Sequence, residues 1–146
     1  MHFYHSMIFM FIISFIIQYY LMSLIIANNT NNITNSIGKL YMSIIMGILM
    51  IIAQIYMHDS SYNVFSIKLY TIFIFILLVV IYFYRNQLFI NDREYLREMI
   101  EHHSMALLTS NQIIKKSNDY NVVKLAKNII ETQNNEINIM KNLLNK

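Results

Sequence analysis

Residues 7–27 read MIFMFIISFIIQYYLMSLIIA, a run with no charged side chain and a single amide, Gln18. The hydrocarbon core of a bilayer requires roughly 20 apolar residues per helix, so this run is long enough to span one. The whole chain shares the bias, since 56% of its 146 residues are hydrophobic and only 13% are charged. An average soluble domain is about one quarter charged, so the composition argues against an ordinary soluble protein.

Two further uncharged runs, residues 40–57 and 69–84, follow the first. The third run reaches spanning length if Lys68 extends its ammonium group towards the headgroups. The alternative is a soluble bundle of three buried helices, but such helices need a polar stripe that these runs lack. The sequence therefore predicts an all-α protein with three transmembrane helices, at about residues 7–27, 38–57 and 66–84.

The charged side chains divide the chain in two. Only Lys39, Asp59 and Lys68 lie before residue 85, and residues 85–146 hold the other sixteen of the nineteen. We therefore expect a transmembrane region over residues 1–88 and a polar helical module over residues 89–146. The chain has no Cys and no Pro, which excludes thiolate chemistry and disfavours a turn-rich β fold. A net charge of +3 in so apolar a chain gives no indication of nucleic-acid binding.

The orientation of the three spans follows from the basic residues beside them. Three spans place the loop after the first span and the C-terminal tail on one side of the membrane. Close to the spans, that side holds the basic residues Lys39, Arg85, Arg93 and Arg97. Positive charge beside a span favours the cytoplasm. Two glycosylation sequons in the same loop, which begin at Asn28 and Asn32, point the other way. We expect a cytoplasmic tail.

Residues 91–146 carry the pattern of an antiparallel helical hairpin. Asn91-x-x-Glu94 is a capping-box signal, and apolar residues recur at helical spacing as far as about Lys116. A polar turn at residues 117–121 separates this helix from a second amphipathic helix, at about residues 122–144. Two such helices joined by a short turn pack against each other.

Polar residues interrupt the apolar stripe of each predicted helix near the same height. In an antiparallel hairpin with a turn at residues 119–120, Met99 faces Met140, His103 faces Glu136, and Ala106 faces Gln133. Together with His102, these positions bring imidazoles, thioethers, a carboxylate and an amide to one place. Imidazole and thioether ligands suit copper(I), for which silver(I) is a mimic, and imidazoles with a carboxylate also suit zinc, copper(II) or iron. The alternative is a metal-free polar network.

The same residues resemble a known family. Met99-x-x-His102-His103-x-x-Ala106, followed by Leu125-Ala126-x-x-Ile129-Ile130-x-x-Gln133-x-x-Glu136-Ile137-x-x-Met140, is similar to the family called domain of unknown function 305. The resemblance covers residues 91–146. It implies a ferritin-like helical fold, of which one hairpin is half a four-helix bundle, and copper binding, which some members show.

The resemblance also implies roles for particular residues. Met99, His102, His103 and Met140 are the implied metal ligands, and Gln133 and Glu136 line the site. The Met- and Tyr-rich spans look like those of the membrane-anchored branch of the family. Two positions depart from the pattern, since Thr109 replaces a frequent Met and Glu101 replaces the Pro that usually precedes the His pair.

The combined pattern predicts a multi-pass membrane protein whose tail binds a copper-class ion for buffering or handover. The alternative is a structural membrane protein whose tail assembles with itself. Catalysis has little support, because the sequence lacks paired nucleophiles, phosphate loops and di-iron motifs, and a metal-dependent redox enzyme is a distant third hypothesis. A lone two-helix hairpin has little core, so we expect a homodimer through the tail. Ile100, Leu107 and Leu108 widen the apolar face of the first helix and motivate this expectation.

Overall fold

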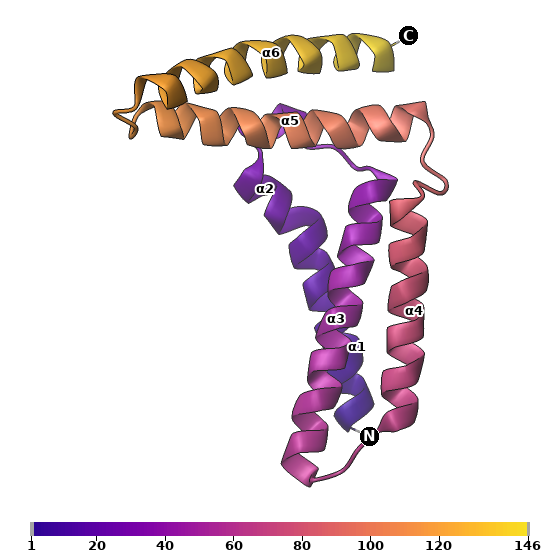
Figure 1. Cartoon of the computed structure of the whole chain (residues 1–146). Helices are drawn as coiled ribbons and strands as arrows, with labels where there is room; N and C mark the ends of the chain where they lie inside the picture. The colour runs from indigo at the N-terminus through magenta and orange to yellow at the C-terminus, as the bar shows by residue number, and fades with distance from the viewer. Residues whose placement is uncertain (1, 146) are drawn as a thin grey trace. The chain divides into compact units, whose positions relative to one another are not determined.

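The computed structural model describes residues 2–145, with side chains from Phe3 onward, and over these residues it contains helices and no strand. The predicted all-α class is therefore confirmed. Figure 1 shows the elements, which are α1 (His2–Ile16), the π-helix η1 (Ile17–Leu21), α2 (Met22–Ile26), the 3₁₀ turn η2 (Thr30–Asn32), α3 (Ile37–Tyr62), α4 (Ile67–Arg85), α5 (Asp92–Ile114) and α6 (Tyr120–Leu144).

Three helical stretches are long and apolar enough to cross a membrane: Phe3–Ile26, Ile37–Tyr62 and Ile67–Arg85. They coincide with the three spans predicted from the sequence. The second stretch continues five residues beyond the predicted end at Met57. The polar residues after Met57 therefore extend the helix instead of forming a linker.

The ends of α3 and α4 explain where these helices stop. Asn63 adopts a left-handed backbone with φ of 51°, and the amide of Val64 donates to the carbonyl of Asp59 at 3.1 Å. Gln87, with φ of 52°, and Leu88, bonded to Phe83, repeat the arrangement after α4. This Schellman geometry satisfies carbonyl groups that a helix end would otherwise leave unpaired. The chain achieves it without a Gly at either position.

The chain folds into two compact units, and each unit combines segments that are separated in the sequence. The first unit comprises residues 2–21 and 38–89, and the second comprises residues 22–37 and 90–145. Met22–Ile37, which comprises the end of the first span, the loop after it and the first residue of the second span, therefore groups with the hairpin.

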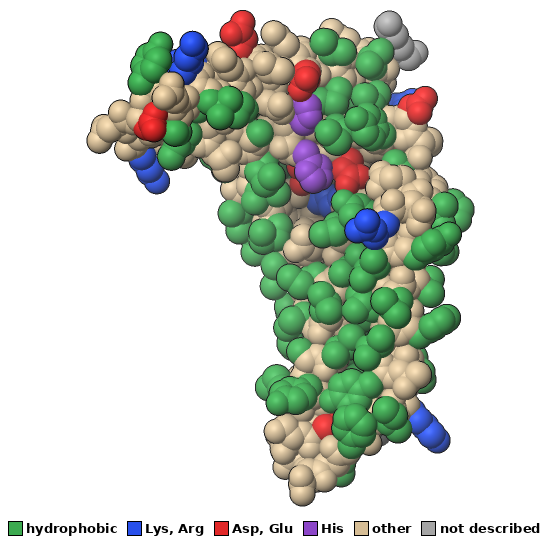
Figure 2. Space-filling model, viewed as in Figure 1, with side chains coloured by type: hydrophobic (Ala, Val, Ile, Leu, Met, Phe, Trp, Pro, Cys, Tyr) green, Lys and Arg blue, Asp and Glu red, His purple; other side chains and the backbone are tan. Residues whose placement is uncertain are grey.

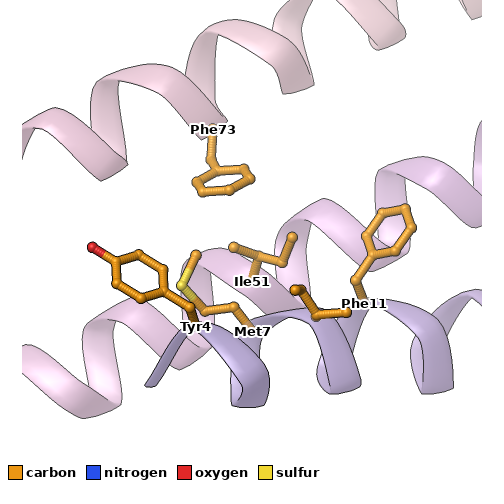
Figure 3. A pocket seen from close by; sticks show the side chains of 6 residues that line it. Tyr4, Met7, Phe11, Ile51 and Phe73 are labelled. Carbon is orange, nitrogen blue, oxygen red and sulfur yellow. The ribbon is translucent and has the colours of Figure 1, made fainter. Parts of the chain in front are cut away.

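In the first unit, α1 and α3 pack closely at Gly47, where the absence of a side chain leaves room for Phe11. A Cβ atom built on Gly47 would lie 2.6 Å from Cδ2 of Phe11, closer than real contacts allow. Met7, Ile51 and Ile55 form a small buried core beside this contact. The core is bordered by an open apolar pocket of about 390 Å³, shown in Figure 3, with Phe73 of α4 on its far side.

In the second unit, α5 and α6 form the predicted antiparallel hairpin (Figure 1). Asn91 caps α5 by accepting from the amide of Glu94, and Asp119 caps α6 by accepting from the amides of Asn121 and Val122. The core between the helices consists of four buried side chains, Ile100, Leu107, Ile137 and Met140. Ile100 and Leu107, which the sequence suggested were left for a second chain, are thus 1% and 3% exposed within one chain.

Candidate metal-binding site

His103 and Glu136 meet across the hairpin, as the antiparallel numbering predicts. Nδ1 of His103 lies 3.2 Å from Oε2 of Glu136. The geometry does not make a hydrogen bond, so this nitrogen is buried with no hydrogen-bond partner among the described residues. Gln133 donates from Nε2 to the same carboxylate oxygen at 3.4 Å. A buried imidazole nitrogen thus points at a carboxylate with its bonding capacity unused.

The two predicted thioethers lie in one apolar cluster next to this pair. Met140 is 8% exposed and belongs to the buried core of the hairpin, and Met99 packs against that core. Both lie about one helical turn from the His103–Glu136 contact along their helices. Thr109, where many family members carry Met, instead donates its hydroxyl to the carbonyl groups of Met105 and Ala106.

His102 does not join the other predicted ligands. Successive residues of a helix point about 100° apart, so His102 turns away from α6 when His103 faces it. Its side chain is 56% exposed, and Nε2 lies 3.7 Å from Oε1 of Glu98 on the same helix. The hydrogen bond to Glu98 raises the pKa of His102 above its usual value, with further support from the charges of Glu98 and Glu101 and opposition from partial burial.

A buried polar network on another side of α5 was not foreseen from the sequence. Its centre is Glu101, whose carboxylate accepts from the hydroxyl of Ser23 and, at 3.1 Å, from the amide of Thr34. One turn later, Ser104 is fully buried, and its hydroxyl oxygen accepts from the amide of Asn28 at 3.0 Å and the side chain of Asn32 at 3.3 Å. The segment 22–37 is thereby bonded to α5 on the two positions that flank the His pair.

Further contacts in the second half of the segment complete this attachment. The amide of Ile37 donates to Glu94 at 2.8 Å, and the hydroxyl of Thr34 donates to the carbonyl oxygen of Arg97 at 2.5 Å. Lys141 of α6 donates to Oδ1 of Asn32 at 2.5 Å. Asn32, at the start of one predicted sequon, is only 7% exposed with both ends of its amide engaged. Its amide is therefore closed to modification in the folded unit.

The positions of these side chains determine which metal ligands a single chain brings together. Over residues 2–145, no three side chains of His, Asp, Glu or Cys come together in a group suited to hold a metal ion. The hairpin instead offers one imidazole, one carboxylate and two thioethers at adjacent heights, with the second imidazole outside. A donor set this rich in sulfur suits soft ions that accept few ligands, such as copper(I), better than zinc or iron.

Comparison with known proteins finds a family that resembles the helical hairpin. The family model described as "Domain of unknown function (DUF305)" matches residues 90–146. The uncharacterized protein L153 of Acanthamoeba polyphaga mimivirus is 44% identical over 69 residues, which are 47% of this chain and 45% of that protein. The chain therefore aligns with slightly less than half of this relative. No solved structure matches the chain. The helical hairpin that follows the three apolar helices thus matches the DUF305 family over residues 90–146.

Proposed function

We propose that this membrane protein holds, through its DUF305 hairpin, a soft metal ion of the copper class, and that it buffers the ion or hands it to a partner. The single observation that carries the proposal is the buried Nδ1 of His103. This nitrogen lacks a hydrogen bond, lies 3.2 Å from Glu136 and sits beside the cluster that contains Met99 and Met140. A buried nitrogen without a partner is costly, and a bound ion would relieve that cost.

Each residue has a defined part in this proposal. His103, Met99 and Met140 hold the ion, and copper(I) accepts such a nitrogen and sulfur set. Glu136 supplies negative charge beside the imidazole, and Gln133 orients that carboxylate through its hydrogen bond. The proposal requires no catalytic step. Binding without turnover fits a site whose ligands lie on the two helices of a small domain that follows a bilayer anchor.

Copper(I) affinity of the full chain in mild detergent tests the proposal, measured against a competing chelator under reducing conditions. Substitution His103→Ala should weaken binding about tenfold or more, and so should the Met99→Leu/Met140→Leu pair. His5→Ala, an exposed histidine of the first unit, is the matched control and should leave the affinity unchanged. Tighter binding of zinc than of copper(I), or full affinity after loss of both Met, would refute a soft-metal site.

A second function has its own observation in favour. Glu136 already accepts from Gln133 and contacts His103, so the three side chains can serve as a purely structural network in a tail that assembles with itself. In that case His103→Ala should lower the thermal stability of the hairpin, whereas the wild-type chain should bind no copper(I) or silver(I).

A further inference from the structure

One face of the hairpin has apolar side chains that nothing in the described part of the chain covers. On α6 the exposed fractions are 60% for Leu125, 57% for Ile139 and 47% for Leu143. Tyr95 and Ile113, near the two ends of α5, are 52% and 40% exposed. We propose that this surface, called the open face below, binds the same face of a second copy of the chain and completes the metal site.

The open face is continuous across both helices. At about 100° per residue, the exposed apolar residues of α6 fall within an arc of about 100° that adjoins the stripe buried against α5. Lys141 lies on the far side of that stripe, where it bonds to Asn32 of the segment 22–37. The segment thus covers one side of the hairpin, and the open face is the opposite side. Figure 2 shows histidine side chains on the visible face of the upper part of the view, beside acidic side chains and among hydrophobic ones.

The charge pattern of α6 favours a second copy over other occupants. The border of its apolar row carries uncharged amides at every seventh residue, namely Asn121, Asn128, Asn135 and Asn142. Of the charged residues, Lys127, Glu131 and Lys141 lie towards the opposite side of the helix, whereas Lys124, which is five whole turns before Asn142, lies on the border itself. An interface between identical chains brings like residues together, so amides, which both donate and accept, avoid the repulsion that like charges would cause. The carboxylate of Glu136, which lies within the face, contacts His103 of its own chain at 3.2 Å.

A membrane surface is a poorer occupant of this face. Helices that lie in the bilayer interface border their apolar side with Lys or Arg, which pair with lipid phosphates. Here one basic residue of α6, Lys124, borders the open face. The face itself contains the carboxylate of Glu136, which is 45% exposed. An anionic group among amides is unsuited to an anionic lipid surface.

A twofold pair would also supply the ligands that one chain lacks; this part rests on the proposed function. His102 and His103 lie at the middle of α5, and Glu136 lies one turn past the middle of α6. A twofold axis through the centre of the open face places mid-helix residues of the two copies close together. His102, which is 56% exposed in one chain, would then approach the site from the second copy. Two hairpins give the four helices of a complete bundle.

The mass of the metal-free full chain in mild detergent tests the interface, by light scattering corrected for bound detergent. Wild type should show twice the 17.4 kDa of one chain. Substitution Leu125→Lys/Ile139→Lys places two charges on the open face and should halve the mass. Asn134→Lys/Asn138→Lys adds the same charges to exposed positions on the opposite side of the same helix and should preserve the dimer. Circular dichroism verifies that both variants remain helical.

Cross-linking gives an independent test, because the chain contains no cysteine. Thr132→Cys, in the middle of the open face of α6, should join two chains through a short bis-maleimide, and Asn134→Cys on the opposite side should not. A wild-type protein with the mass of one chain would overturn the proposed interface. A Leu125→Lys/Ile139→Lys variant that remains dimeric would overturn it as well. A dimer that binds no copper(I) would overturn the proposed function alone, and a monomer that binds it would overturn the interface alone.

Discussion

Two adjacent histidines of one helix have different surroundings. His103 is 16% exposed and meets Glu136 across the hairpin, whereas His102 is 56% exposed and meets Glu98 on its own helix. The difference follows from the step of about 100° between neighbouring residues. The motif His102-His103 therefore places one imidazole inside the hairpin and one at its surface.

Replacement of Glu98 by Gln should lower the pKa of His102 towards its ordinary value, because the hydrogen bond to the carboxylate is the main cause of the upward shift. A pKa raised by folding stabilises the folded state below the pKa of the unfolded chain, about 6.5, and this benefit is lost as the pH rises through the folded value. The variant should thus be less stable than wild type near pH 5.5 and equally stable near pH 9. An NMR titration of the histidine ring protons measures the shift. Glu131→Gln, an exposed carboxylate of α6, should leave it unchanged.

Glu101 has a role that its neighbours in the sequence did not reveal. It stands where the family usually has Pro, and it is buried as the acceptor for Ser23 and Thr34. The local pattern of α5 placed Glu101 outside the stripe that faces α6, which is correct. Its partners could not be deduced, because they lie more than sixty residues earlier and nothing in their spacing indicates a contact with α5.

Substitution Glu101→Ala should release the segment 22–37 from α5. It removes the acceptor of the partly buried Thr34 amide, and a donor left without a partner in a protein interior costs up to about 1–3 kcal/mol. Hydrogen exchange of the Thr34 amide should then accelerate about tenfold or more, since about 1.4 kcal/mol corresponds to a factor of ten. Glu131→Ala serves as the control, and unchanged exchange in Glu101→Ala would show that the network does not hold the segment.

At the level of elements, the helices of the hairpin were predictable and their attachments were not. The capping residues Asn91 and Asp119 follow from local sequence, and the meeting of His103 with Glu136 follows from the turn position alone. The continuation of α3 to Tyr62 was missed, because no Gly or Pro marks the end and Asn63 provides the left-handed residue instead. The position of a helix end depends on backbone geometry, which the polarity of the sequence does not indicate.

The contact of α1 with α3 depends on the missing side chain of Gly47. In Gly47→Leu, the new Cβ would fall 2.6 Å from the ring of Phe11, so either that ring or one of the helices must shift. Overpacking of this kind costs about 1–3 kcal/mol, which should lower the Tm by roughly 2–8 °C. Ala53→Leu adds the same side chain at an exposed position of α3 and should have little effect. Recovery of the Tm in Gly47→Leu/Phe11→Ala would identify the ring as the obstacle, and no recovery would contradict this explanation.

At the level of the whole molecule, the contacts of the second unit constrain the membrane topology. Asn28 and Asn32, which follow the first span, bond to Ser104, which follows the third span. Thr34 likewise bonds to Glu101 and Arg97. Groups in contact lie on the same side of a bilayer, so an even number of spans must separate them. The two apolar helices Ile37–Tyr62 and Ile67–Arg85 satisfy this requirement.

Single cysteines introduced into the cysteine-free chain should report this topology through a membrane-impermeant maleimide applied to intact cells. Asn29→Cys and Asn145→Cys, both at exposed positions, should react from one side, and Ser60→Cys, near the exposed end of α3, should react from the other. Asn32 is unsuited to labelling because it is buried and hydrogen-bonded. The basic residues beside the spans predict that Asn29→Cys and Asn145→Cys react only after the cells are opened. Reaction of these two from opposite sides would refute three spans, whereas reaction of both in intact cells would keep three spans and reverse their orientation.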